Sequence, residues 1–131
     1  MPDWRQEIPS REELELLQLE RLQSTLNRAY RQVKFYRRRF DELQLRPNDV
    51  QDLGQVARLP LTTRTDLSQN YPYGLFAVPL REVVRIQSSP GTTANPMVVG
   101  YTAGDLRFWR ELTARLYRSA DVGKDDIVQI I

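Results

Sequence analysis

The sequence predicts an α/β fold in which a mainly helical region, residues 1–80, precedes a region of strands and one helix, residues 81–131. Two observations support this expectation. Apolar residues recur at steps of three and four in the first region, which is the period of a helix with one buried face. Short β-branched runs then flank a loop rich in hydroxyl groups, a pattern typical of strands.

The first expected element is a helix from Ser10 to about Tyr36. Ser10 and Glu13 have the spacing of a capping box, in which each side chain binds a backbone N–H at the helix start. The expected buried face consists of Leu19, Leu22, Leu26, Ala29, Tyr30 and Val33.

Three arginines, residues 37–39, follow this helix and lie between Phe35 and Phe40. One interpretation is a site for phosphate or another anion. The other is a solvated face whose charges are balanced by Asp41 and Glu42. A nucleic-acid-binding helical domain is a further alternative that rests on this run and its aromatic neighbours, and salt-dependent binding would test it.

Two shorter helices are expected next. The turn-forming residues 46–49 precede a predicted short helix over Val50–Ala57. Thr63 and Asp66 form a second capping-box pattern and predict a helix that runs to about Asn70.

The strands are expected in the second region. Leu75–Pro79 is either a buried loop or an edge strand, because proline cannot donate to a central ladder. Val83–Ile86 and Met97–Tyr101 are predicted to pair as antiparallel strands, with Gln87–Pro96 as a specialised connection between them.

A helix and a last strand complete the expected order. Thr102 and Asp105 form a third capping-box pattern, and Gly123 suits a left-handed helix end. The β-branched run Asp126–Ile131 predicts a buried strand. The apolar stripe of the helix consists of Leu106, Trp109, Leu112, Leu116 and Ala120.

An apolar strand at the end of a chain is an open edge that invites aggregation. We therefore expect the chain to be the front part of a longer protein. We also expect an exposed apolar surface near Val128–Ile131 and around Trp109, which would drive self-association into a homo-oligomer or lower solubility.

Composition excludes several classes of chemistry. The chain has 19 basic and 17 acidic residues and no cysteine or histidine. A net charge of +2 gives no support to nucleic-acid binding. Disulfide scaffolds, the usual zinc sites and Ser-His-Asp triads are excluded, and no metal ligand is assigned. Any catalysis must rest on carboxylates, arginine, lysine, hydroxyls or the backbone, and no catalytic residue is assigned. Without a secretory signal or a membrane-spanning stretch, we expect a cytoplasmic protein with no membrane partner.

The segment that indicates a function is the connection between the two strands. Hydroxyls and backbone N–H groups in such a loop can surround phosphate oxygens, and glycine allows a close approach of the backbone. The loop lacks the Gly-Lys-Ser/Thr of a Walker motif. The candidate cofactor-binding residues are Ser88, Ser89, Gly91, Thr92 and Thr93.

This loop resembles the Ser-Ser-Gly-Thr-Thr-Gly-Lys-Pro signature of adenylate-forming enzymes, and the chain resembles the phenylacetate–CoA ligases from about Leu14 to Gln129. The further matching stretches, in the same order as in the family, are Val33–Tyr36, Leu59–Leu67, Asn70–Pro79 and Val99–Thr102.

The resemblance implies an AMP-forming acid–thiol ligase that uses ATP with Mg²⁺ and CoA. Such enzymes convert an aryl-acetate, a small carboxylic acid, to an acyl-adenylate and then to the acyl-CoA. It also implies that the loop closes on the ATP phosphates, with Pro96 at its end.

Three positions depart from the family pattern. Pro90 replaces a serine, Ala94 replaces a glycine and Asn95 replaces the lysine, so a donor and a positive charge are lost. The family's adenine-binding, acid-binding and catalytic lysine segments have no counterpart before Ile131. We therefore expect no ligase turnover from this chain alone. The alternative is a non-catalytic relative that acts as an interaction or dimerisation module.

Overall fold

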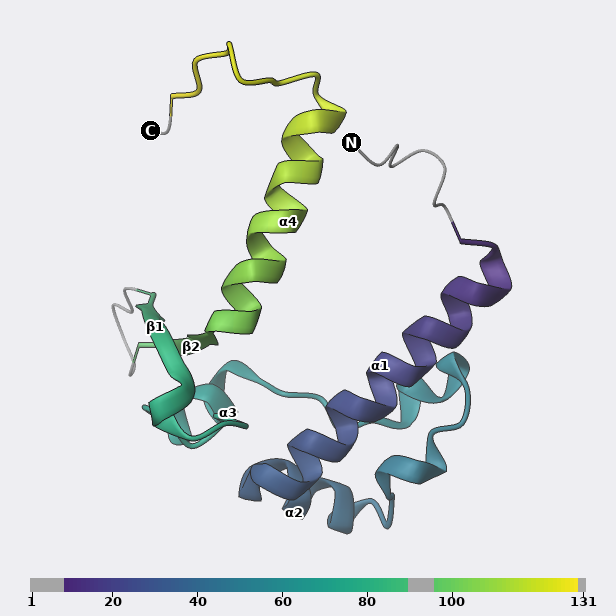
Figure 1. The fold of residues 1–131 in the computed structure, drawn as a ribbon. Helices are drawn as coiled ribbons and strands as arrows, with labels where there is room; N and C mark the ends of the chain where they lie inside the picture. Colours follow the sequence, from purple (N-terminus) through teal and green to yellow (C-terminus); the bar gives the residue numbers. More distant parts are fainter. Residues whose placement is uncertain (1–8, 90–95, 130–131) are drawn as a thin grey trace. The chain divides into compact units, whose positions relative to one another are not determined.

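The computed structural model describes residues 9–89 and 96–129 (Figure 1). The chain forms two compact units: the first covers the described residues up to Ala77 together with residues 96 and 97, and the second covers Val78–Ser89 and the described residues from Val98, which include both strands. The predicted domain boundary between residues 80 and 81 stays a prediction. In the described part of the chain, no helix has the length and apolar character needed to cross a membrane.

Helix α1, Arg11–Gln32, begins as the sequence predicts. The Ser10 backbone N–H donates to Glu13 Oε2 at 2.8 Å, and the Glu13 N–H donates to Ser10 Oγ at 3.2 Å. These two bonds satisfy orphan donors of the first turn.

The end of this helix lies four residues earlier than expected. Val33 adopts an extended backbone, φ −113° and ψ 109°, and separates α1 from helix α2, Lys34–Glu42. The prediction of one helix to Tyr36 is therefore wrong at its end. Breaking the helix here buries Val33 itself and lets α2 bury Phe35 and Phe40.

Helix α2 ends in a Schellman motif without glycine. Gln44 takes the left-handed conformation, φ 52°, and its N–H donates to the Asp41 carbonyl at 3.0 Å. The Leu45 N–H donates to the Phe40 carbonyl at 3.0 Å, and both side chains lie in one apolar cluster. This contact is the one that commonly accompanies the motif.

The core of the first unit joins α1, α2 and the segment that follows them. Val50, which is fully buried, accepts a hydrogen bond on its carbonyl from Gln23 Nε2 at 2.9 Å. The cluster comprises Leu26, Phe40, Leu45 and Val50, with Leu22, Tyr30 and Leu59 packed against it.

The predicted short helix is displaced. Val50 ends the turn η1, Pro47–Asp49, instead of starting a helix. The next helical segment is the 3₁₀ helix η2, Leu53–Arg58, which begins at Asp52, whose carboxylate accepts from the Gln55 N–H at 3.1 Å. Val50 is buried in the core and therefore lies outside the helical segment η2. Periodicity in the sequence alone does not reveal this burial.

Helix α3, Arg64–Gln69, is tied to α2. Its predicted capping box is present, with the Thr63 N–H donating to Asp66 Oδ2 at 2.8 Å. Arg39 Nη2 lies 3.3 Å from Asp66 Oδ1, and the Tyr36 and Thr62 hydroxyls are hydrogen-bonded at 3.1 Å. Two contacts thus join α2 to the segment that carries α3.

A loop, Leu75–Pro79, leads from the first unit into the second. It forms no strand, so the edge-strand alternative is wrong, and it is half-buried up to Val78 and exposed at Pro79 rather than buried. After the turn η3, Leu80–Glu82, strand β1, Val83–Ser88, pairs antiparallel with β2, Val98–Thr102 (Figure 1). The predicted antiparallel pair is confirmed, with an irregular register between Val83 and Arg85.

Helix α4, Ala103–Ser119, begins at the predicted cap but ends differently. The Thr102 N–H donates to Asp105 Oδ2 at 2.8 Å. At the other end Asp121, φ 56°, takes the left-handed position, and the Val122 N–H donates to the Tyr117 carbonyl at 3.0 Å. The assignment of that position to Gly123 is wrong, because aspartate also tolerates this conformation.

The last predicted strand, Asp126–Ile131, is not formed in its described part, residues 126–129. Ile127 is 99% exposed. A strand needs a neighbour for its ladder hydrogen bonds, and the sheet of the described residues consists of β1 and β2 alone. Residues 130 and 131 lie outside the described residues.

The pKa of the Asp66 carboxyl is lowered from 3.8, first by the Thr63 backbone N–H, then by the Thr63 hydroxyl and Arg39. A lowered folded-state pKa stabilises the fold above the unfolded pKa and loses this effect as pH falls through the folded value. We predict that the first unit loses helical circular dichroism progressively below pH 3.8. Asp66→Asn should make this loss shallower.

Glu13→Gln is the matched control, because the Glu13 carboxyl also has a lowered pKa, due first to the Ser10 backbone N–H, but lies on the exposed start of α1. Glu13→Gln should change the dependence of helical circular dichroism on pH less than Asp66→Asn does. An Asp66→Asn profile identical to that of the unmodified chain would contradict the assigned role of Asp66.

Candidate functional site

The hairpin of β1 and β2 brings the two ends of the candidate loop together. Ser88, the last residue of β1, is paired with Val98, the first residue of β2, so residues 89–97 connect adjacent strand ends. The loop is slightly shorter than expected, because Gln87 belongs to β1 and pairs with Val99.

Two of the five candidate residues lie in the described part of the chain. Ser88 and Ser89 are exposed where β1 ends, and neither hydroxyl is hydrogen-bonded to another residue that the structure describes. Free hydroxyls at a loop entrance are groups that can bind phosphate oxygens. Pro96, at the other end of the loop, is half-buried.

The remaining candidates, Gly91, Thr92 and Thr93, lie outside the described residues, as do the departing positions Pro90, Ala94 and Asn95. The structure therefore brings Ser88 and Ser89 to one end of the hairpin. The convergence of all five residues on one ligand stays a prediction.

The arginine run at residues 37–39 is used within the first unit. Arg37 Nη2 donates to the Arg31 carbonyl at 2.7 Å and so caps the end of α1. Arg38 Nε lies 3.6 Å from Glu42 Oε1. Arg39 contacts Asp66, as described above. These contacts favour the interpretation of the run as a solvated face over that of a phosphate site. Asp41, which is expected from the sequence to balance the run, instead pairs with Arg46, with 2.5 Å between Asp41 Oδ1 and Arg46 Nη1.

The shifted pKa values among residues 9–89 and 96–129 belong to groups outside the hairpin of β1 and β2. The two carboxyls with resolved pKa shifts, Glu13 and Asp66, are both capping residues of the first unit. No group of three or more carboxylates there is placed to hold a metal ion.

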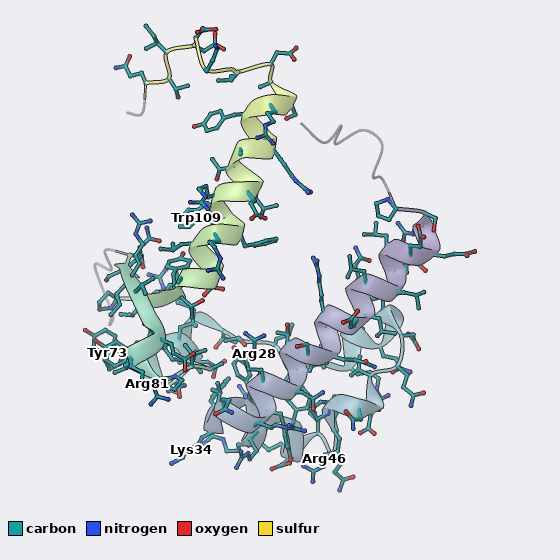
Figure 2. The ribbon with its side chains drawn as sticks, viewed as in Figure 1. Arg28, Lys34, Arg46, Tyr73, Arg81 and Trp109 are labelled. Atoms are coloured by element: carbon teal, nitrogen blue, oxygen red, sulfur yellow. The ribbon has the colours of Figure 1, made fainter. Side chains whose placement is uncertain are left out.

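A hollow of about 500 Å³ lies between β2 and the first turns of α4. Trp109, one of its lining residues, is labelled in Figure 2. The rings of Tyr101 and Trp109 lie 5.4 Å apart at 31°. The helical spacing predicted Trp109 as part of an apolar stripe, but its pairing with Tyr101 depends on how α4 leaves the hairpin. The lining residues are Gly100, Tyr101, Asp105, Phe108, Trp109 and Leu112.

No family model matches the chain. The phenylacetate–coenzyme A ligase of Escherichia coli (strain K12) is 44% identical over 124 residues, which are 95% of this chain and 28% of the relative. The phenylacetate–coenzyme A ligase of Pseudomonas putida is 48% identical over 113 residues, 86% of this chain and 26% of the relative.

The chain is a homologue of phenylacetate–coenzyme A ligases. It spans about a quarter of the length of these curated relatives, and the match is to an N-terminal portion of a phenylacetate–coenzyme A ligase. The resemblance that the loop and its neighbouring motifs predict is confirmed.

Solved structures give the same result for the fold. 2-Hydroxyisobutyryl-CoA ligase in the postadenylation state, in complex with 2-HIB-AMP, matches with a TM-score of 0.73 at 27% identity, over 85% of this chain and 24% of that chain. The same ligase in the thioesterification state, with 2-HIB-AMP and CoA, matches with a TM-score of 0.72 at 31% identity, over 81% of this chain and 24% of that chain. The predicted α/β fold class is confirmed.

Proposed function

We propose that the chain is the part of an AMP-forming, phenylacetate–CoA ligase-like enzyme that supplies the loop for the phosphates of ATP. The observation that carries this proposal is the hairpin, which presents Ser88 and Ser89 at the entrance of the loop within a chain homologous to these ligases. Ser88, Ser89, Gly91, Thr92 and Thr93 are the proposed phosphate-binding residues.

The proposed reaction has two steps. An oxygen of the carboxylate attacks the α-phosphorus of ATP, and the bond to the departing pyrophosphate breaks, which leaves an acyl-adenylate. The sulfur of CoA then attacks the acyl carbon, and AMP departs. The solved relatives hold an acyl-AMP and CoA, which supports this order.

The loop residues act in the first step. Hydroxyl and backbone N–H donors placed before the reaction stabilise charge that grows on the departing pyrophosphate. Mg²⁺ would offset part of the same charge. The acid substrate is proposed to be an aryl-acetate, and the site of action the cytoplasm.

The loop differs from the family pattern at three positions, and restoring the family residues there provides a test by gain of function. We predict that Pro90→Ser, Ala94→Gly and Asn95→Lys together raise the affinity of the chain for MgATP by about tenfold or more. The reason is that a charge-assisted hydrogen bond contributes roughly 1.5–3 kcal/mol. Isothermal titration calorimetry measures the change.

Adding Ser88→Ala and Ser89→Ala to that variant should remove most of the gain, while pyrophosphate release with MgATP, phenylacetate and CoA stays at background in every variant. An unchanged affinity in the loop-restored variant would contradict the assignment of the loop. Chain-dependent turnover would contradict the expectation that the chain alone is inactive.

A second candidate function, an interaction or dimerisation module, is favoured by the apolar surface of α4. No residue of α4 is buried, and Leu112 and Leu116 are 46% and 66% exposed. Ile127 and Val128 beyond the helix are also exposed. The exposed surface predicted for this region is present, and self-association through it is the proposal.

We predict that the chain self-associates at high concentration and that Leu112→Gln with Leu116→Gln shifts it toward the monomer. Sedimentation velocity measures this, because removal of apolar side chains lowers the area available for association. The matched control is Leu16→Gln with Leu17→Gln on α1, where the two leucines are 69% and 37% exposed. A monomer at all concentrations, or an equal effect of both pairs, would contradict this function.

A further inference from the structure

The segment from the middle of α1 into α2 carries an unbalanced positive charge. Residues 21–40 contain seven basic residues and no acidic residue, although the whole chain has a net charge of only +2. Four of the seven, Arg21, Arg28, Arg31 and Lys34, are exposed and have no ion pair or side-chain hydrogen bond with another described residue. The other three are the internally used arginines 37–39.

Three of these free cations share one face of a helix. Arg21 and Arg28 are seven residues apart, and Arg31 follows three residues later, so all three lie on neighbouring positions of the α1 surface. We call Arg21, Arg28 and Arg31 the basic row. It spans roughly 15 Å along the helix, at 1.5 Å per residue. Arg28 and the nearby Lys34 are labelled in Figure 2.

Like charges three residues apart destabilise a helix. The position of Arg31 in the last turn offsets part of this effect, because cations are favourable near a helix C-terminus. Arg21 lies in the middle of α1, where the end of the helix provides no such compensation.

The surroundings of the row indicate which anion fits it. The one aromatic residue of α1 is Tyr30, and its ring is packed against Phe40, Arg37 and Arg46. In the described part of the chain, α1 therefore presents no aromatic ring on which nucleic-acid bases could stack. The apolar residues of α1 that accompany the row, Leu22, Leu26 and Tyr30, belong to the core cluster, whereas the exposed leucines of α1, Leu16 and Leu17, precede the row. The row itself therefore lacks the free apolar face of a membrane-surface helix.

Guanidinium groups match carboxylates with paired hydrogen bonds. We propose that the basic row is a docking surface for an acidic helix of a partner protein, with carboxylates spaced to meet Arg21, Arg28 and Arg31. This inference is independent of the proposed ligase function, because all of its residues lie on α1.

The test uses the full chain and two fluorescent, alanine-based helical peptides of equal composition. One peptide has three glutamates at the spacing of the row, and the other has them distributed around the helix. At low salt, we expect the first peptide to bind at least about fivefold more tightly by fluorescence anisotropy. Equal binding of both peptides would overturn the proposal.

The variant Arg21→Gln, Arg28→Gln, Arg31→Gln should lower the affinity for the matched peptide by about tenfold or more. Arg110→Gln, Arg115→Gln, Arg118→Gln removes the same charge from exposed positions of α4 and should change it less than twofold. Circular dichroism of both variants checks that the helices persist. Equal losses in the two variants, or tighter binding of an RNA oligonucleotide or of anionic phospholipid vesicles, would overturn the proposal.

Discussion

The antiparallel pairing of β1 with β2 is the constraint on which the candidate site depends. It fixes Ser88 opposite Val98, and therefore sets the distance that the loop of residues 89–97 must close. The same strand β2 ends at Thr102, whose side chain caps α4. One short ladder thus positions the entrance of the loop, the start of the following helix and the hollow beside Trp109.

Three helix starts in this chain use the same local device, a hydroxyl residue followed three positions later by a carboxylate. These starts are predictable from sequence because all their contacts fall within four residues. The pair of strands is likewise predictable from two β-branched runs around a loop. The family resemblance adds the identity of the loop, which the hydroxyl and glycine content alone leaves open.

The parts that sequence reasoning missed depend on contacts between distant residues. Arg39 meets Asp66 and Gln23 meets Val50, each across 27 positions. No periodicity in the sequence encodes these pairs. The same explanation applies to the early end of α1, where burial of Val33 determines the break.

Two further predictions, the left-handed position at Gly123 and the strand Asp126–Ile131 in its described part, are wrong because residue type alone does not determine conformation. Asp121 takes the left-handed position because its N–H and that of Val122 satisfy the last carbonyls of α4. Residues 126–129 remain outside the sheet because β-propensity without a neighbouring strand forms no ladder.

We propose that the loop binds phosphate, which the homology and the hairpin support, while the basic row lies on α1 of the first unit. The two are expected to bind a nucleotide with different sensitivity to salt. The basic row attracts any anion weakly and in proportion to charge, and such attraction is screened by salt. A loop that binds its ligand through hydrogen-bond donors in fixed positions is less sensitive: salt weakens this binding less than it weakens the attraction of the basic row.

The most direct measurement is a titration of the ¹⁵N-labelled chain with MgATP, followed by amide chemical shifts at two salt concentrations. The account predicts that the amides of Ser88, Ser89, Gly91, Thr92 and Thr93 shift together, with one apparent affinity at both salts. Shifts confined to residues around Arg28 and Arg31 that disappear at high salt, or no shifts in the loop at saturating nucleotide, would contradict it.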